Sequence, residues 1–449
     1  MSCGPVRTAP TKPSSPPPGA LVTECDTTLI DGSLVPSRDC TRLAWVSHAG
    51  GKQRVVVDGV RGATYDRIGT GSVVFSKDSR RVGYCAALGQ SWFAVVDGKE
   101  SNEYDQMGRG SPVFSPDGRH AAFVACRAGK WYVVIDDAES PPYDTAALPV
   151  FCAEGDHVAY VAASGGKAFV VADGQEGERF DVIAPEGLAL SPDGQRVIYG
   201  ALRDKECFVV VDGVPKGGFR DFGTGSLMFT SDGSHAGYVA TLPDGGQVAV
   251  VDQQLGKRYD GIGAGSFSFS PDGKHVAYAA HEGDKWFTVV DGEEGKPYDA
   301  VFEVVFSPDS RRLAFSARVG EKPVVVVDGR EYEVAGSVGH GTLMFSPDSR
   351  RVAWVCIGRH GHSVVVDGES WAAVDGVEQK TLAFGPDSKH VVCIARVGGE
   401  YCVVADGSRR TSFGAIVTVG DGRVVFDSAD QIHYLALAGR RIYLVQEEL

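Results

Sequence analysis

Short apolar runs alternate with acidic turns along almost the whole chain. One recurring phrase is an apolar run that ends in Asp-Gly, first seen at Val55–Gly59 and Val95–Gly98. Its Asp returns at steps of 37 to 40 residues, as far as Asp406. A second phrase, Phe-Ser-Pro-Asp followed by Gly or Ser, falls between these runs, as at Phe269–Gly273 and Phe306–Ser310. A period of about 39 residues predicts one supersecondary unit repeated many times, not several unrelated domains.

Each unit is predicted to contain four short strands and no helix. In the second unit we expect strands over 71–75, 81–86 and 91–96, and a fourth that contains Glu103, Tyr104 and Asp105. The third strand is rich in aromatic and β-branched residues, which suit a pleated surface. No stretch keeps a helical period over more than a few residues.

The turn phrases have a physical explanation that does not involve chemistry. Asp-Gly supports the positive φ angles of a two-residue hairpin, whose twist matches that of the flanking strands. Pro-Asp presets φ at the first turn position and lets the Asp side chain bond nearby amides. We therefore interpret the recurrent acids as structural, in preference to catalytic or metal-binding carboxylates.

The two ends of the chain complement each other. The C-terminal unit has three strands, at 423–426, 432–436 and 441–445, and stops before a fourth. The N-terminal stretch Val22–Asp26 matches a lone fourth strand. Together they predict an all-β fold, a single closed β-propeller of eleven four-stranded blades whose last blade is completed by the N-terminal strand, because closure removes open sheet edges. Two smaller propellers are the alternative.

Two regions follow from this pattern. Residues 1–20 are rich in Pro, Ser and Thr, the composition of a flexible segment, and residues 21–449 form the propeller. From sheet spacings, eleven blades would surround a central channel on the order of 20 Å across between backbones.

The repeats resemble a known family. The phrases Phe269–Tyr278 and Phe306–Phe315 are similar to the WD40-like repeats of TolB-type propellers, and the likeness extends from about Val22 onward. The resemblance implies a propeller fold and non-enzymatic binding of other proteins. Two departures, a tighter period and the lack of a separate N-terminal α/β domain, mean that the particular partners of that family are not implied.

Composition narrows the function classes. The net charge of −14 argues against a nucleic-acid binder, which needs a basic face. No apolar run approaches eighteen residues, so no membrane span is expected. The ten cysteines include no C-x-x-C pair, and we interpret them as small apolar residues of the strands in preference to disulfides or metal ligands.

No catalytic motif was found, and we expect neither an enzyme nor a cofactor. A hydrolase would need G-x-S-x-G between a strand and a helix. Gly-x-Gly-Ser runs at 69–72, 108–111, 223–226 and 263–266 resemble phosphate cradles, but lack the Lys and the helix of a P-loop. We expect them to link the fourth strand of one blade to the first of the next. His360 and His362, with His340, could form a metal site, but a solvated loop is the preferred interpretation.

Binding is expected on one face of the ring. The two tight turns of each blade share an acidic, monotonous face, whereas the opposite face carries the connections that vary most, and such loops are the usual recognition surface. The candidate binding residues are Arg127, Lys130, Trp131, Arg203, Lys205, His281, Lys285, Trp286, Arg318, Lys322, His360 and His362. Trp92, Trp131 and Trp286 share one position and are expected to pack between blades, or else to act as anchors at the rim.

The leading hypothesis is a scaffold that binds another protein through this variable face. The alternative is a binder of a small ligand or carbohydrate in the channel or between blades. An enzyme with its residues in the channel would need non-recurring carboxylates or histidines on the first strands, which are mostly apolar. Met1–Gly4 resembles the end of a bacterial lipoprotein signal without its apolar region. Either the signal has been removed from a cell-envelope lipoprotein, or the protein is cytoplasmic and the match is chance. Because the cysteines are expected to be unpaired, a cytoplasmic location is favoured.

Overall fold

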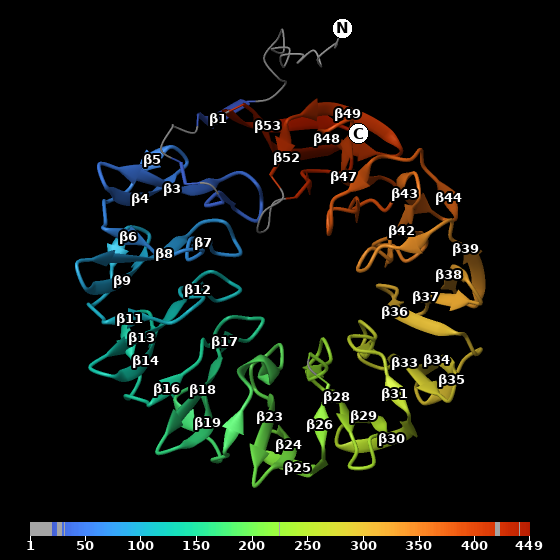
Figure 1. Cartoon of the computed structure of the whole chain (residues 1–449), viewed down its shortest axis with the longest axis horizontal. Coiled ribbons are helices and arrows are strands. Elements are labelled where there is room, and N and C mark those ends of the chain that lie inside the picture. The colour runs from blue at the N-terminus through green and yellow to red at the C-terminus, as the bar shows by residue number, and fades with distance from the viewer. Residues whose placement is uncertain (1–19, 25–28, 31, 224, 418–422, 440) are drawn as a thin grey trace, which may run out of the picture.

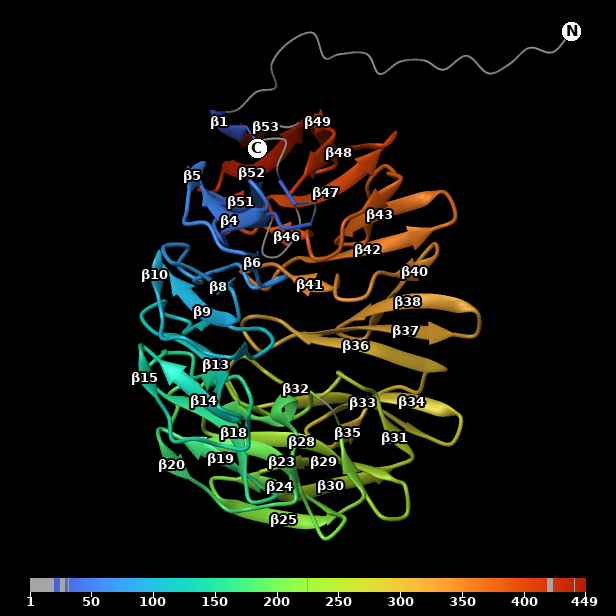
Figure 2. The ribbon, with the colours of Figure 1, turned by 60° about the vertical axis from the view of Figure 1, so that its left-hand side comes forward.

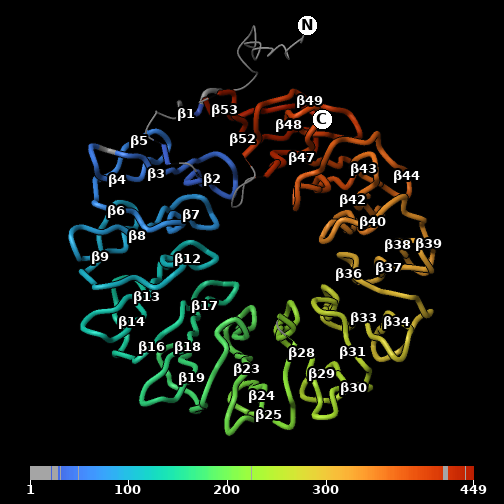
Figure 3. Tube along the Cα trace, in the orientation of Figure 1, coloured from blue at the N-terminus to red at the C-terminus, as the bar shows by residue number. Residues whose placement is uncertain are grey.

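The chain forms one closed ring of eleven antiparallel sheets (Figure 1). The computed structural model describes residues 20–24, 29–30, 32–223, 225–417, 423–439 and 441–449. The blades follow one another around the ring in chain order, and the trace passes once around a single centre (Figure 3). The predicted eleven-bladed propeller is confirmed, and two smaller propellers are ruled out. We number the blades 1 to 11 from β2 (Val35–Pro36).

The two central strands of each blade are the long ones. The second strands are β3 (Leu43–Ala49), β8 (Val82–Leu88), β13 (Ala121–Arg127), β18 (Val158–Ser164), β23 (Val197–Arg203), β28 (Ala236–Thr241), β33 (Val276–Glu282), β37 (Leu313–Val319), β42 (Val352–Gly358), β47 (Val391–Val397) and β52 (Gln431–Ala438). The third strands are β4 (Lys52–Val57), β9 (Ser91–Val96), β14 (Lys130–Ile135), β19 (Lys167–Ala172), β24 (Glu206–Val211), β29 (Gln247–Val251), β34 (Lys285–Val290), β38 (Lys322–Val327), β43 (Gly361–Val366), β48 (Glu400–Ala405) and β53 (Arg441–Glu448).

The innermost strand is usually made of two short pieces that pair with the same second strand. The first pieces are β6 (Arg67–Ile68), β11 (Gln106–Met107), β16 (Thr145–Ala146), β21 (Val182–Ile183), β26 (Asp221–Phe222), β31 (Gly261–Ile262), β40 (Ser337–Val338), β45 (Gly376–Val377) and β50 (Ala415–Ile416). The second pieces are β7 (Val74–Phe75), β12 (Val113–Phe114), β17 (Val150–Phe151), β22 (Ala189–Leu190), β27 (Met228–Phe229), β32 (Ser268–Phe269), β41 (Met344–Phe345), β46 (Ala383–Phe384) and β51 (Val425–Phe426). Blade 8 instead has one continuous strand, β36 (Ala300–Phe306).

This division corrects the expected position of the Gly-x-Gly-Ser runs. They lie within the innermost strand, not between two blades. In blade 3, Ser111 N–H donates to the Gly108 carbonyl at 3.2 Å, and Val124 N–H donates to Ser111 Oγ at 3.0 Å. The serine hydroxyl thus accepts the bond that a backbone carbonyl would accept in a regular ladder, so the turn interrupts the strand without leaving the sheet.

The outer strands are short, and their bounds differ from the expectation. They are β5 (Val60–Arg61), β10 (Lys99–Glu100), β15 (Ala138–Glu139), β20 (Gln175–Glu176), β25 (Val214–Phe219), β30 (Gln254–Tyr259), β35 (Glu293–Glu294), β39 (Arg330–Glu333), β44 (Glu369–Ser370) and β49 (Ser408–Phe413). In blade 2 the strand was expected over Glu103–Asp105. It instead pairs at β10, and Tyr104 returns to the sheet by a single bridge to Trp92.

The N-terminal strand closes the ring as predicted. β1 (Ala20–Glu24) pairs antiparallel with β53 and takes the outer place in blade 11 (Figures 1 and 2). Cys25 and Asp26, which the sequence placed in the same strand, lie outside the described residues. The pairing covers the edge of an eight-residue strand that would otherwise be open to other chains.

Aromatic pairs fill most of the junctions between blades. Tyr65, at the end of blade 1, meets Tyr84 of blade 2 edge to face, with ring centroids 6.2 Å apart. Equivalent pairs lie at eight further junctions: Tyr104–Phe123, Tyr143–Tyr160, Phe180–Tyr199, Phe219–Tyr238, Tyr259–Tyr278, Tyr298–Phe315, Tyr332–Trp354 and Phe413–Tyr434. Such pairs contribute about 0.5–1.5 kcal/mol each beyond their buried area. They fix each blade against the next and make the ring a rigid support for its loops.

Helix is almost absent from the described residues. A single 3₁₀ turn, η1 (Pro185–Gly187), interrupts the innermost strand of blade 5. Within the described residues, no helix is long and apolar enough to cross a membrane.

Candidate functional site

The face that carries the tight turns is built from repeated polar contacts. Asp97 and Gly98 both have positive φ, 51° and 81°, which is the geometry of the predicted two-residue hairpin turn. In the other turn Ser76 Oγ donates to Asp78 Oδ1 at 2.5 Å, and Arg81 N–H donates to Ser76 Oγ at 2.9 Å. The hydrogen bond from Ser76 lowers the pKa of Asp78. These acids therefore act in the turns, as the sequence indicated.

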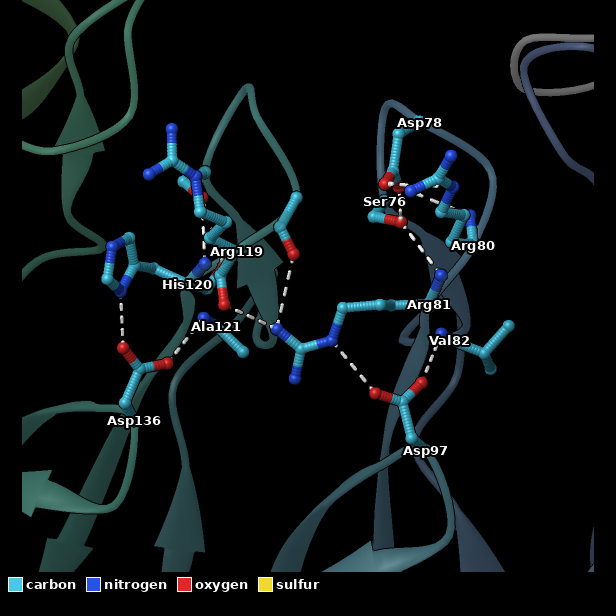
Figure 4. A network of polar contacts seen from close by, with 12 residues as sticks. Ser76, Asp78, Arg80, Arg81, Val82, Asp97, Arg119, His120, Ala121 and Asp136 are labelled. Atoms are coloured by element: carbon cyan, nitrogen blue, oxygen red, sulfur yellow. Dashed lines mark hydrogen bonds and ion pairs between the residues drawn. The ribbon is translucent and has the colours of Figure 1, made fainter.

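An arginine ties each of five blades to its successor on this face, and Figure 4 shows one of these contacts, made by Arg81. Arg81 Nε donates to Asp97 Oδ2 at 2.8 Å, and Val82 N–H donates to Asp97 Oδ1 at 2.9 Å. The same guanidinium donates through Nη1 to the backbone oxygen of Arg119 in the next blade, at 2.7 Å. Equivalent arginines are Arg42, Arg196, Arg312 and Arg351. In these five blades the Asp of the Asp-Gly turn is paired with the positive charge of an arginine. This face is therefore less acidic than its sequence suggests.

Histidine takes the place of this arginine in five other blades. The Nδ1 atoms of His157 and His390 lie 2.7 Å and 2.6 Å from the carboxylates of Asp173 and Asp406, and these hydrogen bonds raise the pKa of both imidazoles. His120, His235 and His275 form the same contact. In Figure 4, His120 bonds Asp136 in its own blade, whereas Arg81 also reaches the neighbouring blade.

The opposite, variable face also carries a repeated tie, which sequence reasoning missed. Lys130 Nζ lies 2.6 Å from Asp144 Oδ1, and Asp144 Oδ2 accepts the N–H of Gly165 in the next blade at 2.8 Å. The hydrogen bond with Lys130 and that from Gly165 lower the pKa of Asp144. The same three-part contact joins Lys52–Asp66–Gly89, Lys167–Asp181–Asp204 and Lys285–Asp299–Gly320. The sequence does carry a signal for this contact, since in each case the Lys precedes the Asp by fourteen residues.

Several predicted binding residues are held by partners within the chain. Arg127 makes two bonds to Glu139, at 3.0 and 2.6 Å, and its guanidinium lies over the ring of Tyr104. Arg203 pairs with Glu178 and covers the ring of Phe180.

The remaining charged candidates of this kind are lysines. Lys130 and Lys285 belong to the ties described above, and Lys322 lies 3.1 Å from Glu333. Lys130 and Lys285 therefore help to hold neighbouring blades together, whereas Lys322 pairs within its own blade.

The aromatic and histidine candidates lie close to the sheets. Trp131 and Trp286 are half-buried against core clusters and bridge to Tyr143 and Tyr298. The ring of His281 lies 4.6 Å from that of Trp286. Trp131 and Trp286 thus pack against the sheets, whereas Trp92 lines a cavity between blades 2 and 3.

Three exposed candidates, Lys205, Arg318 and His360, make no side-chain hydrogen bond or ion pair among the described residues. Hydrogen bonds from Lys285 and Gly320 lower the pKa of Asp299, and the nearby charge of Arg318 adds to this effect. Arg318 adjoins Val319, which is 42% exposed, and Ile357 of the next blade is 39% exposed. Arg318, Val319, Ile357 and His360 lie on the hairpins β37–β38 and β42–β43 of blades 8 and 9. We call these four residues the blade 8–9 patch.

The histidines at blade 9 are not gathered into one group in the structure. Nδ1 of His362 accepts the N–H of Val377 at 3.0 Å, while His360 is exposed. Among the described residues, no three His, Cys, Asp or Glu side chains are placed to hold a metal ion. The eight cysteines in the described part of the chain are buried, and no disulfide joins any two of them. Cys3 lies outside it.

The fold defines a β-propeller, and comparison with known proteins adds no family to this. No family model and no curated protein matches the chain. Among solved structures it is similar to a eukaryotic initiation factor (13% identity, TM-score 0.39, covering 75% of this chain and 96% of that one). It is also similar to the Dos1 propeller (12%, 0.33, 74% and 90%) and to TolB from Acinetobacter baumannii (16%, 0.25, 59% and 67%). At these identities and scores the likenesses carry no argument about function.

Proposed function

We propose that this protein is a non-enzymatic scaffold that binds another protein through the variable face of its propeller. The observation that carries the proposal is the blade 8–9 patch. There, exposed Val319 and Ile357 lie on the same two hairpins as exposed Arg318 and His360, whose side chains make no hydrogen bond or ion pair among the described residues. A cation beside exposed apolar side chains on a rigid support is typical of protein interfaces, where charged partners give register and apolar anchors give affinity.

The regular structure of the rest of the ring supports the same proposal. On both faces the repeated acids are bonded to Arg, His or Lys of the chain itself, as at Arg81–Asp97 and Lys130–Asp144. Side chains that already hold the blades together are poor anchors for a partner, because the partner would have to displace their hydrogen bonds and ion pairs within the chain. A TolB-type role as a binder of proteins, which the repeat phrases imply, is part of this proposal.

The test compares two purified variants with the unaltered protein. The first carries Arg318→Glu, Val319→Ser and Ile357→Ser in the blade 8–9 patch. The control carries Arg80→Glu and Arg350→Glu on the turn face, where both side chains are more than 80% exposed. Partners are captured with the unaltered protein, purified, and titrated by calorimetry against all three.

The proposal predicts that the patch variant weakens binding at least about tenfold, the effect of losing one or two interface anchors. The turn-face control should bind as the unaltered protein does. The proposal would be contradicted if the partner bound the patch variant as tightly as the unaltered protein, or if only the turn-face control lost affinity.

Small-ligand binding between blades stays a second candidate, because cavities do lie at the junctions. Those between blades 1 and 2 and between blades 6 and 7 measure about 420 and 410 Å³. Their walls are formed by residues of the turn face such as Arg42 and His235, which already bond Asp58 and Asp252. These side chains would have to exchange partners to hold a ligand.

A further inference from the structure

Blade 8 departs from the repeat at its innermost strand. Where blade 2 has Gly69–Ser72 between its two inner pieces, blade 8 has only Phe302 and Glu303, so that its strand β36 runs through. Glu303 therefore brings a carboxylate to a position where other blades have a glycine turn.

That carboxylate lies against the glycine turn of the next blade. Burial raises the pKa of Glu303, whereas the nearby backbone N–H groups of Gly341 and Leu343 and the side chain of His340 act in the opposite direction. The Oε2 atom of Glu303 is buried and has no hydrogen-bond partner among the described residues. The turn Gly339–Thr342 thus receives a carboxylate from within the chain, consistent with the tendency of backbone N–H groups in such turns to bind anions.

The equivalent space between blades 2 and 3 is a cavity of about 350 Å³. The turns Gly69–Ser72 and Gly108–Ser111 line it, together with Trp92 and Met107. No Asp or Glu is among the lining residues. The turn of blade 3 has the same form as that of blade 9, since Gly110 and Gly341 have φ of 84° and 70°, and each turn closes with an N–H bond to its first glycine.

One difference between the two turns is informative. Pro112 stands where blade 9 has Leu343, so the blade 3 turn has lost one of the two amide donors. Arg109 stands where blade 9 has His340. Its side chain is exposed at the cavity and has no hydrogen-bond or ion-pair partner among the described residues. A guanidinium is a permanent cation with a donor fork that matches a carboxylate, so it replaces the missing amide with a stronger donor.

We propose that the cavity between blades 2 and 3 binds the carboxylate of a ligand, held by Arg109 and the N–H of Gly110. Trp92 and Met107 contact the apolar part of the ligand next to that group. The ligand class is a carboxylic acid with a short apolar portion, supplied as a free small molecule or as the C-terminus of a peptide. This site is distinct from the blade 8–9 patch, and the inference does not depend on the proposed function.

The experiment titrates the full-length protein with ¹³C-labelled butyrate, followed by NMR, and uses butyramide as the uncharged control. We expect saturable binding of butyrate and none of butyramide. Arg109→Gln should weaken butyrate binding at least about tenfold, the effect of losing a charged hydrogen bond. Replacing residues 69–72 by Phe-Glu, the blade 8 sequence, should fill the cavity from within the chain and abolish binding.

Two controls separate this result from misfolding and from the proposed function. Arg318→Gln, in the blade 8–9 patch, should bind butyrate as the unaltered protein does, and the melting temperature of Arg109→Gln should be unchanged. Equal binding of butyramide, or full butyrate affinity in Arg109→Gln, would overturn the inference.

A second arm identifies the source of the carboxylate. A tetrapeptide that ends in Leu with a free C-terminus is compared with its C-terminal amide and with butyrate. Tighter binding of the free acid peptide than of butyrate assigns the site to a chain terminus, and equal binding assigns it to a small acid. Binding of the amide as tight as that of the acid would contradict the carboxylate site.

Discussion

His433 Nε2 donates a hydrogen bond to the backbone oxygen of Asp39 at 2.6 Å, across 394 positions of the chain. The same ring reaches Asp427 through Nδ1 at 2.7 Å, and its side chain is 6% exposed. His433 belongs to the last blade and Asp39 to the first. This buried side chain therefore ties the two blades at the point where the ring closes, beside the pairing of β1 with β53.

The first prediction concerns this tie. His433→Leu should lower the free energy of unfolding by about 2 kcal/mol, because it removes two hydrogen bonds and leaves a buried acceptor unpaired. The matched control is His275→Leu, since His275 bonds Asp291 within its own blade on an exposed face. Denaturant unfolding measures both. If His433→Leu lowered the free energy of unfolding no more than His275→Leu does, the contact between the last and first blades would not stabilise the protein more than a contact within one blade.

The second prediction concerns the N-terminal strand. Deletion of residues 1–24 should increase the mass of the particles in solution above that of the full-length protein, because β53 then presents an eight-residue open edge to other chains. Light scattering after gel filtration gives the mass. A deletion that stops at residue 19 retains β1 and serves as the control. If the longer deletion had the same oligomeric state and melting temperature as the control, β1 would not close the ring.

The third prediction concerns pH. Hydrogen bonds with Asp173 and Asp406 raise the folded-state pKa of His157 and His390 above 6.5. A raised histidine pKa contributes stability that is fully present below pH 6.5 and is lost as pH rises through the folded value. The melting temperature should therefore fall between about pH 6 and about pH 8.5 by more in the unaltered protein than in a variant carrying His157→Arg and His390→Arg.

Arg351→His provides the reverse test, since it places a titratable group where the chain has a permanent cation bonded to Asp367. It should steepen the decline in melting temperature with pH. An identical pH profile in all three proteins would contradict the assigned role of these pairs.

The fourth prediction concerns the cysteines. Burial raises the pKa of Cys85 and of Cys393 to about 12, so that almost no thiolate is present near pH 8. In a Cys3→Ser, Cys25→Ser background, a thiol reagent should label none of the eight buried cysteines of the folded protein within minutes and all of them after denaturation. Rapid labelling of the folded protein would show that the strands open far more readily than the packing implies.

The sequence was sufficient for the architecture because its turns are local. Asp97-Gly98 specifies positive φ at two successive residues, and that alone fixes a hairpin. The split of the innermost strand was missed because it depends on a side chain, Ser111 Oγ, in place of a backbone acceptor. The pattern of apolar residues does not show that a side-chain oxygen takes the place of a backbone acceptor.

The candidate site was harder to predict than the fold. Lys130 was predicted as a binding residue of the variable face, yet its ammonium group is bonded to Asp144. Contacts between blades join residues whose relation becomes visible only when the ring is assembled, although constant spacings such as Tyr65 to Tyr84 and Tyr104 to Phe123 record them. Glu303 was overlooked for the same reason, since its partners lie in the next blade.

A crystal structure of the full-length protein tests the central claim most directly. The account predicts one ring of eleven blades, with residues 20–24 as the outer strand of the last blade and the His433 ring bonded to the Asp39 carbonyl. Two smaller rings, or a ring whose last blade lacks the N-terminal strand, would contradict it.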